Sequence, residues 1–135
     1  MKAVLITGSR EWTRREPIHQ ALLSEQMEQG EGYELMRAGA DMLLIHGGCR
    51  GADSIAELFA QQSKWNVIPM PAQWEKHGKQ AGILRNVEMV NMAEALRNCG
   101  WDVVVLAFPL PGSRGTRHCM DAAKARGLRV EEPNK

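Results

Sequence analysis

The sequence predicts an α/β fold: a single Rossmann-like three-layer domain with a mainly parallel sheet, spanning residues 1–135. Two observations predict this fold. Short apolar runs are continuous rather than alternating, which is typical of strands covered on both faces. Segments with helical spacing separate these runs, and a regular alternation of strand and helix is the order found in parallel sheets with right-handed crossovers.

The expected strands follow the apolar runs. The first four runs are strongly apolar, and the fifth is weaker. In chain order they cover residues 3–7, 41–46, 66–70, 102–108 and 128–132. Because each run is short and lacks polar alternation, we expect both faces of the sheet to be covered by helices.

The expected helices lie between these strands. They cover residues 16–29, 52–63, 82–97 and 117–126. Pro17 suits the first turn of the first helix, where a missing N–H is not needed, and Gly127 suits a helix end. The polar stretch 28–34 is expected to be a surface loop. No internal repeat or linker divides the chain, so we expect one domain.

Composition excludes several classes of function. The net charge is +1, far from the basic excess of a duplex DNA binder, which argues against a nucleic-acid partner. Three widely spaced cysteines predict reduced thiols and a cytoplasmic protein. No apolar run approaches the length of about 18 residues that a membrane helix needs, so no membrane partner is expected. No spacing typical of a metal site occurs, and no metal ion or cofactor is expected.

Glycine and arginine collect just after the expected strands, where open parallel sheets bind ligands. The relevant stretches are "TGSREW", "HGGCRGAD", "AGILRN" and "PGSRGT". Two glycine-rich loops at one sheet edge predict backbone amides that hold an anion, and phosphate is the expected one. The candidate ligand-binding residues are Gly8, Ser9, Arg10, Gly47, Gly48, Arg50, Gly51, Asp53, Arg85, Asn86, Gly112, Ser113, Arg114, Gly115 and Thr116.

Simpler interpretations of these residues stay open. Each loop could be only a turn, with Asp53 as a helix N-cap and each arginine as a solvated side chain. His46 could be a satisfied core histidine. Neither G-x-G-x-x-G nor the P-loop spacing occurs, which disfavours nicotinamide dinucleotides and the usual triphosphate site. Trp12 and Trp74 fall in these loops and are candidates for stacking on a base. The other two tryptophans precede strands and are expected to cover the core.

Four stretches, "TGSREW", "HGGCRGAD", "AGILRNVEM" and "FPLPGSRGT", together resemble the SLOG superfamily. This Rossmann-like nucleotide-binding group includes the DNA-processing protein Smf and the cytokinin-activating LOG phosphoribohydrolases. The chain is most similar to the small YspA branch, which is common in phages and bacteria. The resemblance covers nearly the whole chain in the right order. It implies a Rossmann-like fold that binds a nucleotide or a nucleotide-derived ligand.

The resemblance also implies roles for particular residues. In the LOG enzymes, a P-G-G-x-G-T-x-x-E motif holds the phosphate and supplies a catalytic glutamate, and an arginine from an upstream helix assists. The match places Gly112, Gly115 and Thr116 in the phosphate loop and Arg85 at that arginine. Two departures follow the same alignment: Ser113 replaces the second glycine, and Cys119 stands where the glutamate would be.

Two functions follow from these departures. Cleavage of an N-glycoside needs charge stabilisation at the developing oxocarbenium ion and help to the attacking water or the leaving base. Cysteine is a poor substitute for either, so the loss of the glutamate favours a binding module that acts as a sensor or sponge. The alternative is a LOG-like nucleoside 5′-monophosphate phosphoribohydrolase or a related nucleotide-processing enzyme. Its candidate catalytic residues are Arg85 and Asp121, with Asp53 or Glu57 as other sources of a carboxylate. A homo-oligomer is expected, because exposed apolar helical faces often pair symmetrically.

Overall fold

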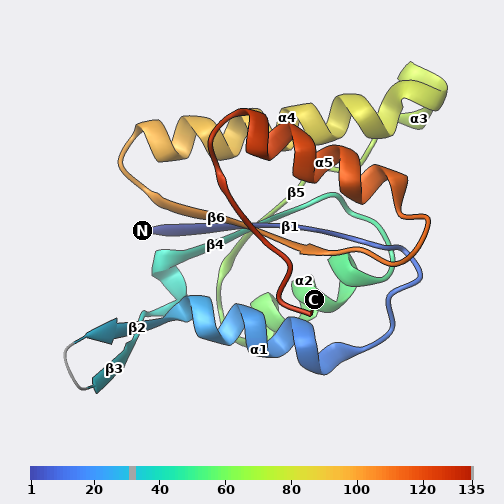
Figure 1. Cartoon of the computed structure of the whole chain (residues 1–135). Coiled ribbons are helices and arrows are strands. Elements are labelled where there is room, and N and C mark those ends of the chain that lie inside the picture. The colour runs from blue at the N-terminus through green and yellow to red at the C-terminus, as the bar shows by residue number, and fades with distance from the viewer. Residues whose placement is uncertain (31–32, 135) are drawn as a thin grey trace.

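The computed structural model describes residues 1–30 and 33–134. Figure 1 shows a central sheet with helices on both sides. The elements in chain order are β1 (Lys2–Gly8), α1 (Arg15–Gln26), β2 (Met27–Gly30), β3 (Tyr33–Met36), β4 (Met42–His46), α2 (Ala52–Gln62), β5 (Asn66–Pro69), α3 (Trp74–His77), α4 (Ala81–Asn98), β6 (Asp102–Phe108), α5 (Arg114–Ala125) and β7 (Arg129–Glu131). Short 3-10 turns, Gly39–Asp41 and Gly78–Gln80, precede β4 and α4.

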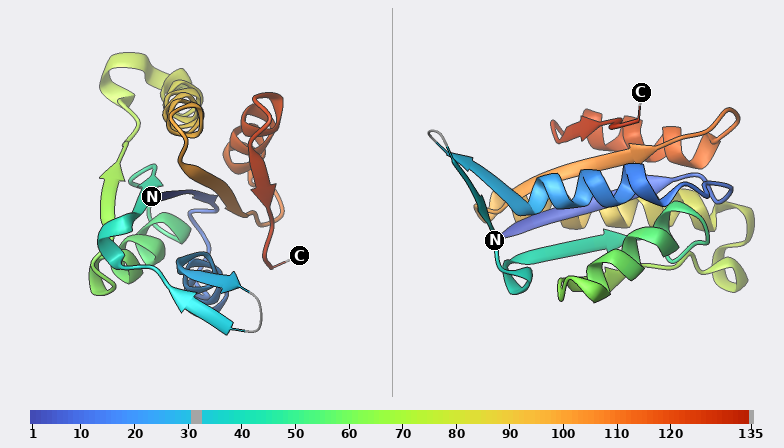
Figure 2. Two further views of the ribbon diagram at one scale, coloured as in Figure 1. Left: turned by 90° about the vertical axis from the view of Figure 1, so that its left-hand side faces the viewer. Right: turned by 90° about the horizontal axis from the view of Figure 1, so that it is seen from below.

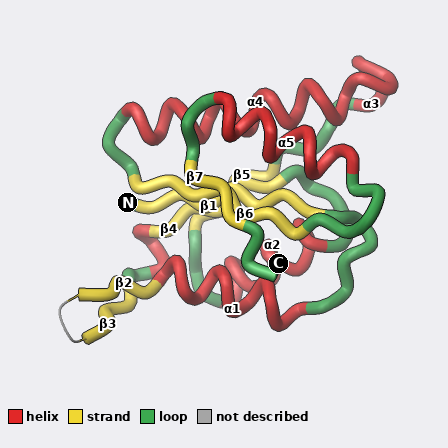
Figure 3. The backbone as a smooth tube through the Cα atoms, in the orientation of Figure 1, coloured by secondary structure: helices red, strands yellow, loops and turns green. Residues whose placement is uncertain are grey.

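Among the described residues, the main sheet has five strands in the order β5-β4-β1-β6-β7, and every neighbouring pair is parallel. Figure 3 draws these strands in yellow. The chain runs outward from β1 to β4 and β5, then returns to β6 on the other side of β1. This reversal creates a topological switch point between β1 and β6, which is where open α/β sheets bind ligands. The predicted α/β fold with a Rossmann-like parallel sheet is confirmed.

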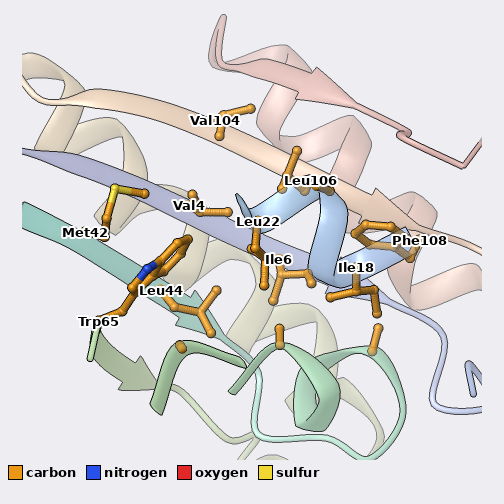
Figure 4. Close-up of a cluster of buried hydrophobic side chains, with 14 of the residues drawn as sticks. Val4, Ile6, Ile18, Leu22, Met42, Leu44, Trp65, Val104, Leu106 and Phe108 are labelled. Carbon is orange, nitrogen blue, oxygen red and sulfur yellow. The ribbon is translucent and has the colours of Figure 1, made fainter. Parts of the chain in front are cut away.

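Two helical layers cover the sheet, with α1 and α2 on one face and α4 and α5 on the other (Figures 1 and 2). Alternate side chains of β1 point to opposite faces. Val4 and Ile6 belong to the core under α1 and α2, drawn in Figure 4, whereas Leu5 belongs to the core under α4 and α5. Each fully buried aliphatic side chain contributes about 1.5–3 kcal/mol, so both layers hold the sheet firmly.

The stretch 28–34, expected to be a surface loop, falls instead in an antiparallel hairpin formed by β2 and β3, while residues 31–32 lie outside the described part of the chain. Helix α1 therefore ends at Gln26, earlier than expected. The reason is that Gln26 closes the base of the hairpin. Its carbonyl accepts a bond from the Arg37 amide and its side-chain amide donates to the Arg37 carbonyl, both at 2.8 Å. The Trp65 indole donates to the same Gln26 side chain at 3.0 Å.

Other differences from the expected elements affect the loops at the carboxyl edge. Helix α5 begins at Arg114 rather than at residue 117, so Arg114 to Thr116 form its first turn. The short helix α3 forms within the long connection after β5, where no helix was expected. Within residues 1–30 and 33–134, no helix combines the length and apolar character needed to cross a membrane.

Candidate functional site

A cavity of about 460 Å³ opens at the switch point between β1 and β6. Its volume lies within the range of small-molecule sites. It brings together segments that follow β1, β5 and β6 and the first turn of α2. The candidate residues that line it are Gly8, Ser9, Arg10, Asp53, Arg85, Asn86, Gly112, Ser113, Arg114, Gly115 and Thr116. The other candidates, Gly47, Gly48, Arg50 and Gly51, do not line it.

The glycines between β4 and α2 do not line the cavity, but Gly47 and Gly51 pack closely against residues that do. Gly51 has a φ of +79°, and a Cβ there would lie 2.4 Å from the Ser9 carbonyl oxygen. A Cβ on Gly47 would lie 2.3 Å from Nη1 of Arg85. Only glycine fits at position 51, because its neighbour there is backbone, whereas a Cβ at position 47 would require the Arg85 guanidinium to shift. Arg50 points to solvent and pairs with Glu11 at 2.6 Å, so the structure does not bring it into the cavity.

Arg85 and Asn86, at the cavity end of α4, join the two glycine-rich loops. Nη1 of Arg85 donates to the Gly47 carbonyl at 2.5 Å, and its Nε donates to Oδ1 of Asn86 at 3.0 Å. The Asn86 side-chain amide then donates to the Gly115 carbonyl at 3.1 Å. Asn86 is only 3% exposed. The pair therefore fixes the distance between the loops as well as placing a guanidinium at the cavity wall.

Asp53 does not serve as the simple N-cap that was one interpretation of it. The N-cap position belongs to Gly51, and Asp53 lies within the first turn of α2. Its Oδ2 accepts bonds from the amides of Gly47 at 3.1 Å and Cys49 at 3.3 Å, which shapes the preceding loop. Burial raises the pKa of this carboxyl above its ordinary 3.8, although His46, these amides and Arg85 oppose the shift. Asp53 is 5% exposed and is among the residues that line the cavity.

The other candidate carboxylates lie elsewhere. Asp121 is exposed on α5 and does not line the cavity. Glu57 hydrogen-bonds to the His46 ring at 3.2 Å. That ring also accepts a bond from the Gly48 amide at 2.9 Å and is 2% exposed, so the interpretation of His46 as a satisfied core histidine is confirmed.

The first turn of α5 lines the cavity, and its amides include some without a partner in the helix. The N-cap residue Ser113 makes no capping bond with its side chain; its hydroxyl accepts a bond from the Leu110 amide at 3.0 Å. The first bond of helical spacing runs from the Arg117 amide to the Ser113 carbonyl at 3.1 Å. The amides of Gly115 and Thr116 have no partner within the helix, because they lie in its first turn, where no helical carbonyl precedes them. The helix dipole makes such amides an anion site.

The cavity lining is more basic than the chain as a whole. It contains four cationic side chains, Arg10, Lys79, Arg85 and Arg114, and two acidic ones, Glu11 and Asp53. Lys79 was missed in the sequence because it lies in a short turn before α4 that no pattern predicts. In the described part of the chain, no three His, Cys, Asp or Glu side chains gather as metal ligands would.

The tryptophans divide differently from the expectation. Trp74 lines the cavity and is 48% exposed, so it stays available for stacking. The Arg10 guanidinium lies over its ring, 5.4 Å from the ring centroid. The proposal that Trp12 stacks on a base is wrong. Trp12 is 5% exposed because its ring packs edge-on against Phe108, with centroids 5.3 Å apart. Trp65 and Trp101 cover the core as predicted.

Cys119, at the position of the glutamate in the resembled motif, is fully buried behind the cavity. Burial raises the pKa of its thiol to about 11, although a hydrogen bond to the Thr7 side chain opposes the shift. The thiol is therefore neutral at physiological pH, and it cannot replace a carboxylate.

Comparison with known proteins identifies the family. A sequence model of the YspA, cpYpsA-related SLOG family matches residues 2–77. A protein of Mycobacterium phage D29, named Gene 61 protein, is 45% identical over 135 residues, which cover 96% of this chain and 94% of the phage protein. No solved structure matches the chain. The chain belongs to the YspA, cpYpsA-related SLOG family.

Proposed function

We propose that this member of the SLOG family binds a nucleotide or nucleotide-derived ligand in the cavity at the carboxyl edge of its sheet, as a sensor or sponge. The first turn of α5 is the observation that carries the proposal. Gly115 and Thr116, whose amides have no partner within the helix, line a cavity with an excess of cationic side chains. A phosphate on these amides gains the helix dipole and the guanidinium of Arg114, which can bind it bidentately.

The proposed partner of the nucleobase is Trp74. It lines the cavity and is 48% exposed, and the exposed side chain of Ile83 also lines the cavity. Stacking of a base on an aromatic ring contributes about 1–3 kcal/mol. The ligand is then oriented with its phosphate at α5 and its base toward α3, across the switch point.

A second candidate is hydrolysis of the N-glycosidic bond of such a nucleotide. Asp53 favours it, because this residue lines the cavity and burial raises the pKa of its carboxyl, as suits a general acid or base. Arg85 would stabilise the negative charge that develops on the leaving base. Asp121 would need to move from the exposed side of α5, so Asp53 is the better source of the carboxylate.

Binding of nucleoside 5′-monophosphates tests the proposal directly. Calorimetric titration of AMP, GMP, CMP and UMP is compared for wild type, Arg114→Ala and Arg117→Ala. Arg114 lines the cavity, whereas Arg117, also exposed on α5, does not. We expect about tenfold weaker binding for R114A, equivalent to ~1.4 kcal/mol, and wild-type binding for R117A. Equal weakening in both variants would show only a nonspecific charge effect, and no binding by wild type would reject the site for monophosphates.

Analysis of the same mixtures over time separates the two candidates. A binding module returns the intact nucleotide, whereas a phosphoribohydrolase releases free base and ribose 5-phosphate. Chromatography of the supernatant after denaturation detects either result. Arg85→Ala is a poorer probe, because Arg85 also packs against Gly47 and its loss disturbs the loop.

The oligomer and the location remain predictions. Exposed apolar side chains at Leu23, Leu35 and Met36, near the hairpin, are candidates for a symmetric contact, and light scattering after gel filtration measures the mass. The three cysteines are free, which fits the expected cytoplasmic location.

A further inference from the structure

One oxygen of Asp53 has no partner within the described part of the protein. Asp53 is only 5% exposed, so water does not reach Oδ1, and Oδ1 makes no hydrogen bond with the described residues. A buried acceptor left unsatisfied costs about 1–3 kcal/mol, and more when it is charged. Such groups are rare in native proteins, and a ligand that supplies the missing donor is one explanation for keeping them.

The protein cannot easily supply the donor itself. The other oxygen, Oδ2, is held by the Gly47 and Cys49 amides, which prevents the carboxyl from turning. The guanidinium of Arg85 is directed to the Gly47 carbonyl and to Asn86 instead of Asp53. Since Asp53 lines the cavity, the missing donor can arrive from there.

The position of Asp53 in the sheet indicates which part of a ligand reaches it. Asp53 follows β4, and the anion site follows β6, with β1 between these strands. Two strand spacings separate them, about 10 Å, so a phosphate on α5 and a contact at Asp53 involve different parts of one ligand. A carboxylate repels phosphate, so the part of the ligand that contacts Asp53 is the sugar or the base. The sugar and the base both carry uncharged hydrogen-bond donors.

We infer that Oδ1 of Asp53 accepts a hydrogen bond from an uncharged donor on the nucleoside part of the ligand, a ribose hydroxyl or an exocyclic amino group. This inference rests on the proposed function. It makes Asp53 the residue that selects among nucleotides, while α5 and Arg114 hold the phosphate that all of them share. A site built to receive a donor rejects an analogue that lacks it, because the buried oxygen then stays unpaired.

Asp53→Asn tests the inference with little change of shape. Its amide oxygen can still accept bonds from Gly47 and Cys49, while its NH₂ group takes the place of Oδ1 and presents a donor to the ligand's donor. Asp41→Asn is the control, because Asp41 is exposed before β4, at the opposite end of that strand. Thermal melting of both variants establishes that they fold.

The ligands are chosen to identify the donor. AMP is compared with its 2′-deoxy and 3′-deoxy analogues and with IMP, which lacks the amino group, and CMP is compared with UMP. We expect wild type and D41N to bind one class of analogue at least tenfold more weakly than its parent, and D53N to show no such preference. Loss with a deoxy analogue assigns a sugar hydroxyl, and loss with IMP or UMP assigns a base amino group.

Two results overturn the inference in different ways. If wild type binds every parent and analogue equally, or if D53N keeps the wild-type preference, Asp53 does not read a donor, although the proposed nucleotide site stands. If wild type binds none of these monophosphates, the proposed function fails for them and the inference fails with it.

Discussion

The two glycine-rich loops at the carboxyl edge look alike in sequence but differ in structure. In the loop between β4 and α2, protein atoms fill the space beside the glycines. A Cβ on Gly47, Gly48 or Gly51 would lie 2.3, 3.1 and 2.4 Å, respectively, from its nearest neighbour. In the segment between β6 and the first turn of α5, a Cβ on Gly112 or Gly115 would meet no atom of residues 1–30 or 33–134 within 4 Å.

This difference shows that glycine has two roles in the site. After β4, it lets Arg85, Pro71 and the Ser9 carbonyl pack closely against the backbone, so the fold itself requires it. After β6, Gly112 supplies a φ of +84° for a turn, but Gly115 has neither a positive φ nor a close neighbour. The described residues place no demand for glycine at position 115, which lines the cavity, and we propose that the ligand is the reason for it.

Substitution in the first loop should have the largest effect. We expect Gly51→Ala to lower the free energy of unfolding by about 3 kcal/mol or more, because it combines an unfavourable φ with overlap on backbone atoms. Gly78→Ala is the control: its φ is +58°, but its surroundings are open, and it should lose about 1 kcal/mol. Urea unfolding measures both. Equal losses would show that backbone strain alone, without packing, explains this loop.

The buried carboxyl of Asp53 should have the next largest effect. Because its folded-state pKa is raised above 3.8, its contribution to stability is complete below that pH and is lost as the pH rises through the folded-state pKa. Asparagine does not titrate. We therefore expect D53N to be more stable than wild type at pH 7, by about 1 kcal/mol or more, with a smaller difference at pH 4. Urea unfolding at several pH values checks this, and a constant difference between the variants would contradict it.

Substitution in the second loop should barely change stability. We expect Gly115→Ala to raise the free energy of unfolding by about 0.5 kcal/mol, through the lower entropy of the unfolded chain. The added methyl should at the same time weaken binding of AMP about tenfold, or ~1.4 kcal/mol, by crowding the anion site. Gly100→Ala, in the open turn before β6 at the other edge of the sheet, should leave binding unchanged. Unchanged affinity in G115A would place the phosphate elsewhere.

Chemical modification of the cysteines should distinguish the cavity from the rest of the protein without any substitution. Cys99 is exposed and should react first with iodoacetamide, whereas buried Cys119, with a pKa of about 11, should react only after unfolding. Cys49 lies within the loop between β4 and α2 and lines the cavity. We expect saturating AMP to slow its modification severalfold while leaving Cys99 unaffected, as mass spectrometry of peptides would show. Equal protection of both thiols would indicate a general change in stability.

Much of the fold could be predicted because burial leaves a local pattern. Continuous apolar runs indicate strands covered on both faces, and strand direction alone places Gly8, Arg85 and Gly115 at one edge. The hairpin of β2 and β3 could not be predicted in this way. It depends on the contact of Gln26 with Arg37 and Trp65, which are distant from it in the chain.

The sequence by itself determined which edge of the sheet carries the polar and glycine-rich loops. Only the tertiary structure decided which of those residues face the cavity. It turned Arg50 to solvent, buried Trp12 against Phe108, brought Lys79 into the lining, and left one oxygen of Asp53 without a partner. The physical reason is that a local pattern specifies whether a side chain is buried. What that side chain touches depends on the packing of segments that the sequence keeps far apart.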